Sequence, residues 1–69
     1  MENKFAFRLR EARIDAGLSR KQLAEKLFVS ERLVCFWENG KRECNFNMLL
    51  NISNILSCSI DYLLGKINI

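Results

Sequence analysis

The chain has 69 residues, the length of one domain, and 49% of them are hydrophobic, which is enough for a small packed core. It has no apolar run of about 18 residues, the length that a membrane-spanning helix needs. The stretch MENKFAFRLREAR is charged throughout and lacks the apolar segment of a signal peptide. We therefore expect one cytoplasmic domain over residues 1–69, with no membrane contact.

Positive charge is concentrated in the first two thirds of the sequence. Residues 4–42 hold ten Lys or Arg against five Asp or Glu, a balance of +5, whereas residues 43–69 hold one Lys against two acids, a balance of −1. Such a division favours a polyanion partner for the basic part and packing or self-association for the rest. An ordinary solvated basic surface gives the same pattern.

The composition argues against a metal site and against an enzyme. Cys35, Cys44 and Cys58 are 9 and 14 residues apart, and the chain has no histidine, so no zinc spacing fits. We expect reduced thiols, with Cys58 buried and the other two more exposed. No nucleophile–base set and no glycine-rich phosphate loop occurs, so we expect neither catalysis nor a cofactor.

The first predicted helix spans residues 3 to 16. Apolar residues recur at helical spacing along it, at Phe5, Leu9, Ala12 and Ala16. Gly17 ends it, since glycine tolerates the positive φ found just past many helix ends.

Two short helices follow, joined by a tight turn. Ser19 and Gln22 match a capping box, which predicts a second helix from residue 19 to about Leu27. Only Phe28 and Val29 separate it from the next N-cap, Ser30. Two helices joined so closely form a helix-turn-helix unit. The third helix covers about residues 31–38 and ends at Asn39-Gly40.

Two further helices complete the predicted fold. Asn45 is the expected cap of a fourth helix, whose inner residues are Phe46, Leu49, Ile52 and Leu56. Ser59 is the expected cap of a short fifth helix, with Ile60, Leu63 and Leu64 inside and Gly65 as its end. The prediction is an all-α, compact five-helix bundle without strands.

The third helix has one apolar face and one displayed face. At about 100° per residue, Leu33, Val34 and Trp37 fall together and form the predicted core stripe. Glu31, Arg32, Cys35 and Phe36 form a contiguous outward face. An α-helix fits the major groove of B-DNA, where outward side chains can contact base edges.

These features together resemble a known family. The pattern GLSxxxLAxxLxVS, the WENGK turn and the terminal SIDYLLG occur in order, as in the helix-turn-helix DNA-binding domain of the phage repressor/Cro (XRE-like) type. The resemblance covers about residues 5–65. It implies a lambda-repressor-like domain that binds double-stranded DNA.

The resemblance also assigns roles to individual residues. Base-edge contacts are implied for Ser30, Glu31, Arg32 and Phe36, with Cys35 on the same face. Phosphate contacts are implied for Arg20, Asn39, Lys41 and Arg42. A structural salt bridge between the first and third helices is implied for Arg13 and Glu38.

Several of these positions have alternative interpretations. Arg32 can pair with guanine or remain solvated. Glu31 can accept a hydrogen bond from cytosine, or it can stabilise the helix through a favourable interaction with the positive end of the helix dipole. Phe36 stands where the family more often has a polar or basic residue, and can touch a thymine methyl or fold back on the first helix. Phe28 stands where glycine is usual. Because an aromatic residue at positive φ is costly, we expect a turn of a different shape.

The functional prediction is a Cro-like transcriptional repressor that binds its operator as a homodimer. Half-sites would lie about 34 Å apart. Tyr62, Ile67 and Ile69 find no obvious place in a five-helix core and are the predicted dimer contact, unless the C-terminus is frayed. The alternative is a protein-interaction module of the same fold, such as an antirepressor or antitoxin, with little DNA binding.

Overall fold

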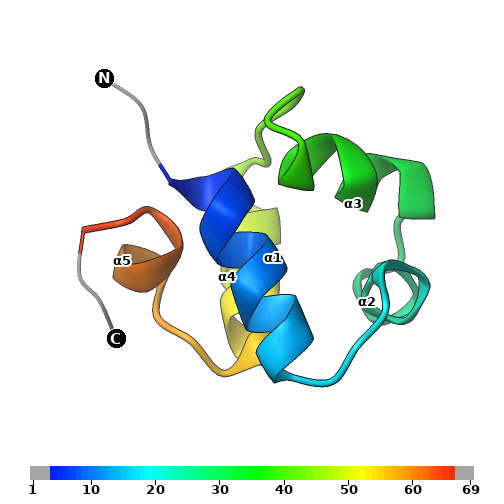
Figure 1. Cartoon of the computed structure of the whole chain (residues 1–69), viewed down its shortest axis with the longest axis horizontal. Helices are drawn as coiled ribbons and strands as arrows, with labels where there is room; N and C mark the ends of the chain where they lie inside the picture. Colours follow the sequence, from blue (N-terminus) through cyan, green and yellow to red (C-terminus); the bar gives the residue numbers. More distant parts are fainter. Residues whose placement is uncertain (1–3, 67–69) are drawn as a thin grey trace.

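The computed structural model describes residues 4–66, which form five helices and no strand. The helices are α1 (Phe5–Asp15), α2 (Arg20–Leu27), α3 (Glu31–Glu38), α4 (Phe46–Leu56) and α5 (Ile60–Leu63). Helices α1 and α4 lie at the centre, with α2 and α3 on one side and α5 on the other (Figure 1). The all-α five-helix prediction is confirmed, although α1 is shorter than the predicted 3 to 16.

Short polar side chains begin four of the five helices. The side chains of Ser19, Ser30, Asn45 and Ser59 each accept a hydrogen bond from a backbone N–H three residues later, at distances of 2.8–3.1 Å. Gln22 also accepts from the Ser19 N–H at 2.8 Å, which confirms the predicted capping box. An N-cap contributes about 1 kcal/mol, so these starts are specified locally.

Every described helix ends in the same way, with a residue at positive φ. These residues are Gly17, Phe28, Gly40, Ser57 and Gly65. In each case the next N–H donates to the carbonyl five residues before it, as Val29 does to Ala24 at 3.0 Å and Cys58 to Ser53 at 3.1 Å. This 6→1 bond of the Schellman motif satisfies a carbonyl that the helix leaves without a partner.

The conformation of Phe28 corrects the expectation of a different turn. Its φ of 59° and ψ of 42° are left-handed, the geometry that a glycine would adopt there. Phe28 is 95% exposed, so packing against neighbouring side chains does not oppose this conformation. The Val29 hydrogen bond and the fixed entry into α3 offset a backbone cost of about 1–2 kcal/mol.

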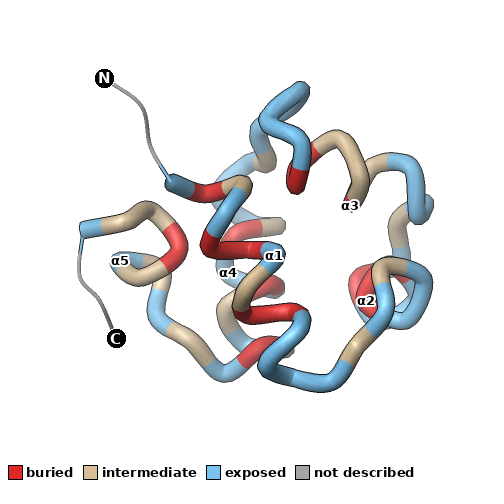
Figure 2. Tube along the Cα trace, in the orientation of Figure 1, coloured by how far each residue is buried: buried red, intermediate tan, exposed pale blue. Residues whose placement is uncertain are grey.

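The core lies between α1, α4 and the inner faces of the other helices (Figure 2). Its fully buried side chains are Leu9, Leu23, Val34, Ile52 and Leu63, so each of the five helices contributes one. Trp37 is also buried, as predicted. The helix-turn-helix pair therefore rests on a shared core and has no separate core of its own.

Some predicted inner residues lie elsewhere. Phe46 is 83% exposed, because it is the first residue of α4 and lies about 90° around the helix from the centre of the Leu49–Ile52–Leu56 stripe. Ala16 is exposed beyond the end of α1. Cys58, expected to be buried, is half-buried, as are Ile60 and Leu64.

Helix α5 is held against α1 by contacts that the sequence did not predict. The Arg8 guanidinium carbon lies 4.5 Å from the centre of the Tyr62 ring, a cation–π geometry. Tyr62 is half-buried there, so it does have a place in the fold. Lys4 approaches Gly65 so closely that a Cβ on Gly65 would lie 2.9 Å from the Lys4 Cβ. Ile67 and Ile69 lie outside the described residues.

Candidate nucleic-acid interface

Helix α3 is built with two chemically different faces. Val34 and Trp37 are buried against the rest of the domain, and Leu33 is half-buried. On the opposite face Glu31 and Arg32 are exposed. Contacts with α1 and α2 fix the orientation of α3. Its outward side chains are therefore presented on a rigid support.

The predicted base-contact residues do lie together, but they differ in exposure. Ser30, Glu31 and Arg32 are exposed around the first turn of α3, whereas Cys35 and Phe36, one turn later, are half-buried. Ser30 accepts the Leu33 N–H at 3.1 Å. Its oxygen is thus engaged as a cap, while its hydroxyl hydrogen remains for another acceptor.

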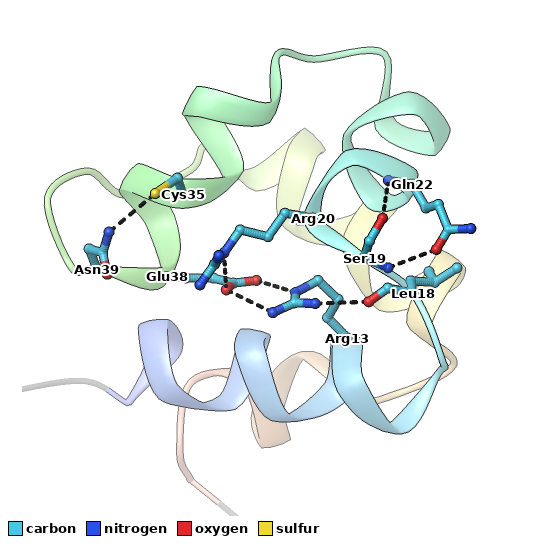
Figure 3. Close-up of polar contacts among 8 residues, drawn as sticks. All are labelled: Arg13, Leu18, Ser19, Arg20, Gln22, Cys35, Glu38 and Asn39. Carbon is cyan, nitrogen blue, oxygen red and sulfur yellow. Dashed lines mark hydrogen bonds and ion pairs between the residues drawn. The ribbon is translucent and has the colours of Figure 1, made fainter.

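Cys35 and Asn39, which were assigned to bases and phosphates respectively, are linked to each other. The Asn39 Nδ2 donates to the Cys35 Sγ at 3.3 Å across one helical turn (Figure 3). Asn39 is exposed, at the end of α3. Its amide also has a carbonyl oxygen and a second N–H, which are the groups that can meet a backbone or a base.

An ion-pair cluster lies beneath this face, centred on Glu38, whose side chain is only 1% exposed. Arg13 Nε donates to Glu38 Oε2 at 2.7 Å and Arg13 Nη2 donates to Oε1 at 3.3 Å. Arg13 Nη1 donates to the Leu18 carbonyl at 2.8 Å. This is the α1–α3 pair that the resemblance implies, and each of the three guanidinium nitrogens of Arg13 is engaged (Figure 3).

Arg20 joins the same carboxylate, which the sequence reasoning missed. Its Nε donates to Glu38 Oε1 at 3.0 Å, and its side chain remains 40% exposed. The only signal available in the sequence was that Glu38 falls on the boundary between the buried and outward faces of α3. That contact depends on the angle between α2 and α3, which the spacing of residues along the sequence does not determine.

The loop after α3 supplies exposed positive charge. Gly40, at φ 72°, turns the chain away from the helix, and the Lys41 N–H donates to the Phe36 carbonyl at 2.9 Å. Lys41 and Arg42 are both exposed, and neither takes part in an ion pair within residues 4–66. They lie at the end of α3 opposite to Ser30.

The thiols do not form a reactive set among the described residues. Burial raises the pKa of the Cys44 thiol above its ordinary value of 9.0, and the nearby Glu43 charge acts in the same direction. Burial likewise raises the pKa of Cys58. Both thiols are therefore protonated at neutral pH.

No cluster of metal-ligating side chains occurs within residues 4–66. No helix in that range is long and apolar enough to cross a membrane.

Known proteins share this arrangement. Residues 9–63 match the model of the helix-turn-helix family. The HTH-type transcriptional regulator ImmR of Bacillus subtilis (strain 168) is 42% identical over 59 residues, which are 86% of this chain and 46% of that protein. This chain thus spans about half of that relative.

Two groups of solved structures have the same fold. The P22 c2 repressor protein in complex with a synthetic operator has a TM-score of 0.86 and 30% identity, over 96% of this chain and 100% of that one. The hydroxypropylphosphonic acid epoxidase from S. wedmorenis has a TM-score of 0.83 and 30% identity, over 90% of this chain but only 33% of the enzyme. The fold therefore occurs both in a DNA-bound repressor and as one part of an enzyme. The extent of the family match and the repressor-like fold lead to one conclusion: this chain belongs to the helix-turn-helix family of the phage repressor/Cro type.

Proposed function

We propose that this chain is a transcriptional regulator that binds operator DNA through the outward face of α3. The observation that carries this proposal is the two-faced structure of α3. Its inner side is buried in the core, while the opposite side displays Ser30, Glu31 and Arg32 at the start of the helix, and a loop with two exposed cations follows its other end. The match to a repressor in complex with an operator supports the same assignment. A DNA-binding regulator must be in the same compartment as its operator, so we also propose a cytoplasmic location.

In the proposed complex the residues divide into two groups. Ser30, Glu31, Arg32, Cys35 and Phe36 face base edges, and Arg20, Asn39, Lys41 and Arg42 face phosphates. Arg32 is the main base-reading residue, because an arginine can donate two parallel hydrogen bonds to guanine. Phosphate contacts fix the position of α3 along the groove without reading the sequence.

A single domain of this size makes few base contacts, so we further propose a homodimer. Two copies would read half-sites about 34 Å apart, one helical turn, and would repress by covering a promoter. Tyr62, Ile67 and Ile69 are the proposed contact. Tyr62 packs on Arg8 and is half-buried, so part of the residue remains accessible to a partner.

We propose no catalytic role. The relation to the epoxidase extends over one third of that enzyme, and this chain lacks histidine, a frequent general acid–base and metal ligand. The second candidate function is a protein-interaction module. The exposed Phe28 and Phe46 favour it, because large apolar side chains in water are typical of protein contacts.

Selection from a random pool of duplexes, with the reduced protein at moderate salt, tests the proposal. We expect enrichment of an inverted repeat whose half-sites are one turn apart, and an affinity that falls steeply with salt as counterions are released. If no sequence is enriched and weak binding does not change with salt, DNA binding fails and the protein-interaction function takes its place.

A further inference from the structure

One buried carboxylate serves two arginines, and the two are not equivalent. Glu38 carries one negative charge, so its cluster with Arg13 and Arg20 retains one positive charge in excess. The Arg13 side chain is 10% exposed and that of Arg20 is 40% exposed. The surplus charge is therefore accessible at Arg20. An anion that approaches this surface meets Arg20 first.

The way in which Arg20 is held decides which of its donors remain available. Its Nε is engaged with Glu38 Oε1 at 3.0 Å, and the structure gives it no other hydrogen bond within residues 4–66. The two terminal Nη groups thus keep their N–H donors for an outside acceptor. In Figure 3 the Arg20 side chain extends from the start of α2 to Glu38 and places its guanidinium beside that carboxylate.

We propose that Glu38 is a positioning residue for DNA binding. It holds Arg20 by the Nε edge so that the Nη groups are directed to one phosphate oxygen pair before DNA arrives. This inference rests on the proposed function. An arginine fixed in this way loses less side-chain conformational entropy on binding than a solvated arginine, so its DNA contact adds more to the affinity.

DNA affinity should then depend on the guanidinium geometry of residue 20 as well as on its charge. A lysine has one compact ammonium group and cannot hold Glu38 with one edge while it presents two donors from another. Arg42 is the matched control, since it is exposed and takes part in no ion pair among the described residues. At position 42 a lysine retains the positive charge, which is all that a cation without a carboxylate partner contributes to phosphate binding.

The experiment is a fluorescence anisotropy titration of a selected duplex with wild type, R20K, R20A, R42K and R42A, each over a salt series. We expect R20K to lose about tenfold in affinity while its salt slope stays at the wild-type value, because charge is retained and geometry is lost. R42K should lose clearly less affinity than R20K, because no carboxylate among the described residues positions Arg42. R20A and R42A should each lower the slope by about one unit.

Two results separate failure of this inference from failure of the proposed function. If R20K binds like wild type while R20A shows a weaker dependence of affinity on salt, Arg20 contributes only its charge, and the positioning role of Glu38 is overturned. If wild type itself shows no salt-dependent binding to any duplex, the proposed function has failed.

A spectroscopic measurement tests the positioning directly, without a variant that endangers the fold. In an ¹⁵N spectrum of the free protein, we expect slow solvent exchange at Nε–H for Arg13 and Arg20 and fast exchange for Arg32 and Arg42. If E38Q folds, it should lose the Arg20 protection and show the affinity loss of R20K. An Arg20 Nε–H that exchanges as fast as that of Arg42 in wild type would overturn the proposal whether or not E38Q folds.

Discussion

At the scale of single residues, Phe28 combines a large aromatic side chain with a backbone conformation that suits glycine. It is left-handed at φ 59°, and its ring is 95% exposed. The ring therefore contributes little to folding, while the Cβ carries the steric cost of that conformation.

Replacing Phe28 by glycine should stabilise the domain. We expect F28G to raise the free energy of unfolding by about 1 kcal/mol, because the strain at the Cβ disappears. That corresponds to an increase in melting temperature of about 4–8 °C for a domain of this size. Thermal unfolding followed by circular dichroism measures it.

The matched control is F28A, which removes the ring and keeps the Cβ. It should stay near the stability of wild type. If F28A gains as much as F28G, the exposed ring and not the backbone was the source of the cost. A position that favours glycine in the family but holds phenylalanine here would then need a different explanation.

Cys44 gives the stability of the domain a pH dependence with a defined sign. Burial raises the pKa of its thiol when the chain is folded, so the folded state keeps the proton that the unfolded state loses above about pH 9. The contribution is fully present below the ordinary value of 9.0 and is lost as pH rises through the folded value.

Denaturant unfolding between pH 7 and pH 10.5 should therefore show a steeper loss of stability in wild type than in C44A, in which that thiol is missing. Comparing the two proteins cancels the contribution of every other titratable group, since they share all of them. Parallel curves would contradict the burial of this thiol. In the same pH range, iodoacetamide should alkylate Cys44 more slowly in the folded than in the unfolded protein.

At the scale of the helices, α3 packs on the core with one face and presents the proposed DNA contact with the other, so mutations on the two faces should behave differently. Arg32 is exposed and lies in the first turn of the helix. We expect R32A to keep the wild-type stability and to lose about 1–3 kcal/mol of discrimination at one base pair. Competition between the selected duplex and single-base variants measures this loss.

Lys41 provides the comparison for that variant. K41A should weaken binding about equally to all duplexes, because it removes a charge and no base contact. If R32A weakens all sequences equally as well, Arg32 is a phosphate contact, and the base-reading assignment has to move to another residue of the face.

Helix boundaries were predictable where the determining interaction is local. Ser19, Ser30, Asn45 and Ser59 begin their helices through bonds to residues three positions away, and Gly17, Gly40 and Gly65 end theirs. The two ends at Phe28 and Ser57 use the same geometry with residues that do not favour it. There the packing of the following helix, and not local preference, selects the conformation.

The site was predicted in part for the same reason. The outward face of α3 follows from helical periodicity, and the Arg13–Glu38 pair came with the family resemblance. The bond from Arg20 to Glu38 and the stacking of Arg8 on Tyr62 join residues that are 18 and 54 positions apart. Contacts of this kind depend on how helices cross, which a single sequence does not specify.

At the scale of the whole molecule, the helices divide the surface into regions. Helices α2 and α3 form one side and α5 the other, with α1 and α4 between them (Figure 1). The proposed dimer contact through α5 would therefore leave α3 of both copies uncovered. This arrangement is compatible with two-fold symmetric binding to an inverted repeat.

Truncation after Gly65 tests the proposed dimer contact. Sedimentation equilibrium should show a dimer for the full chain and a monomer for the truncated one, because Ile67 and Ile69 are removed while the helices remain. Circular dichroism serves as the control for folding. Unchanged dimerisation of the truncated chain would exclude the terminal isoleucines from the contact and direct attention to Tyr62.

The shared carboxylate of Glu38 also has a genetic consequence. The Glu38 side chain joins α3 to Arg13 of α1 and to Arg20 of α2, so we expect most substitutions there to impair folding and the proposed DNA contact together. If the chain is a repressor as proposed, a screen for lost repression would recover Glu38 variants as unstable proteins, and the loss of the Arg20 contact would go unnoticed. Changes at Arg20 would separate the two effects, because Arg13 can still pair with Glu38 in those variants.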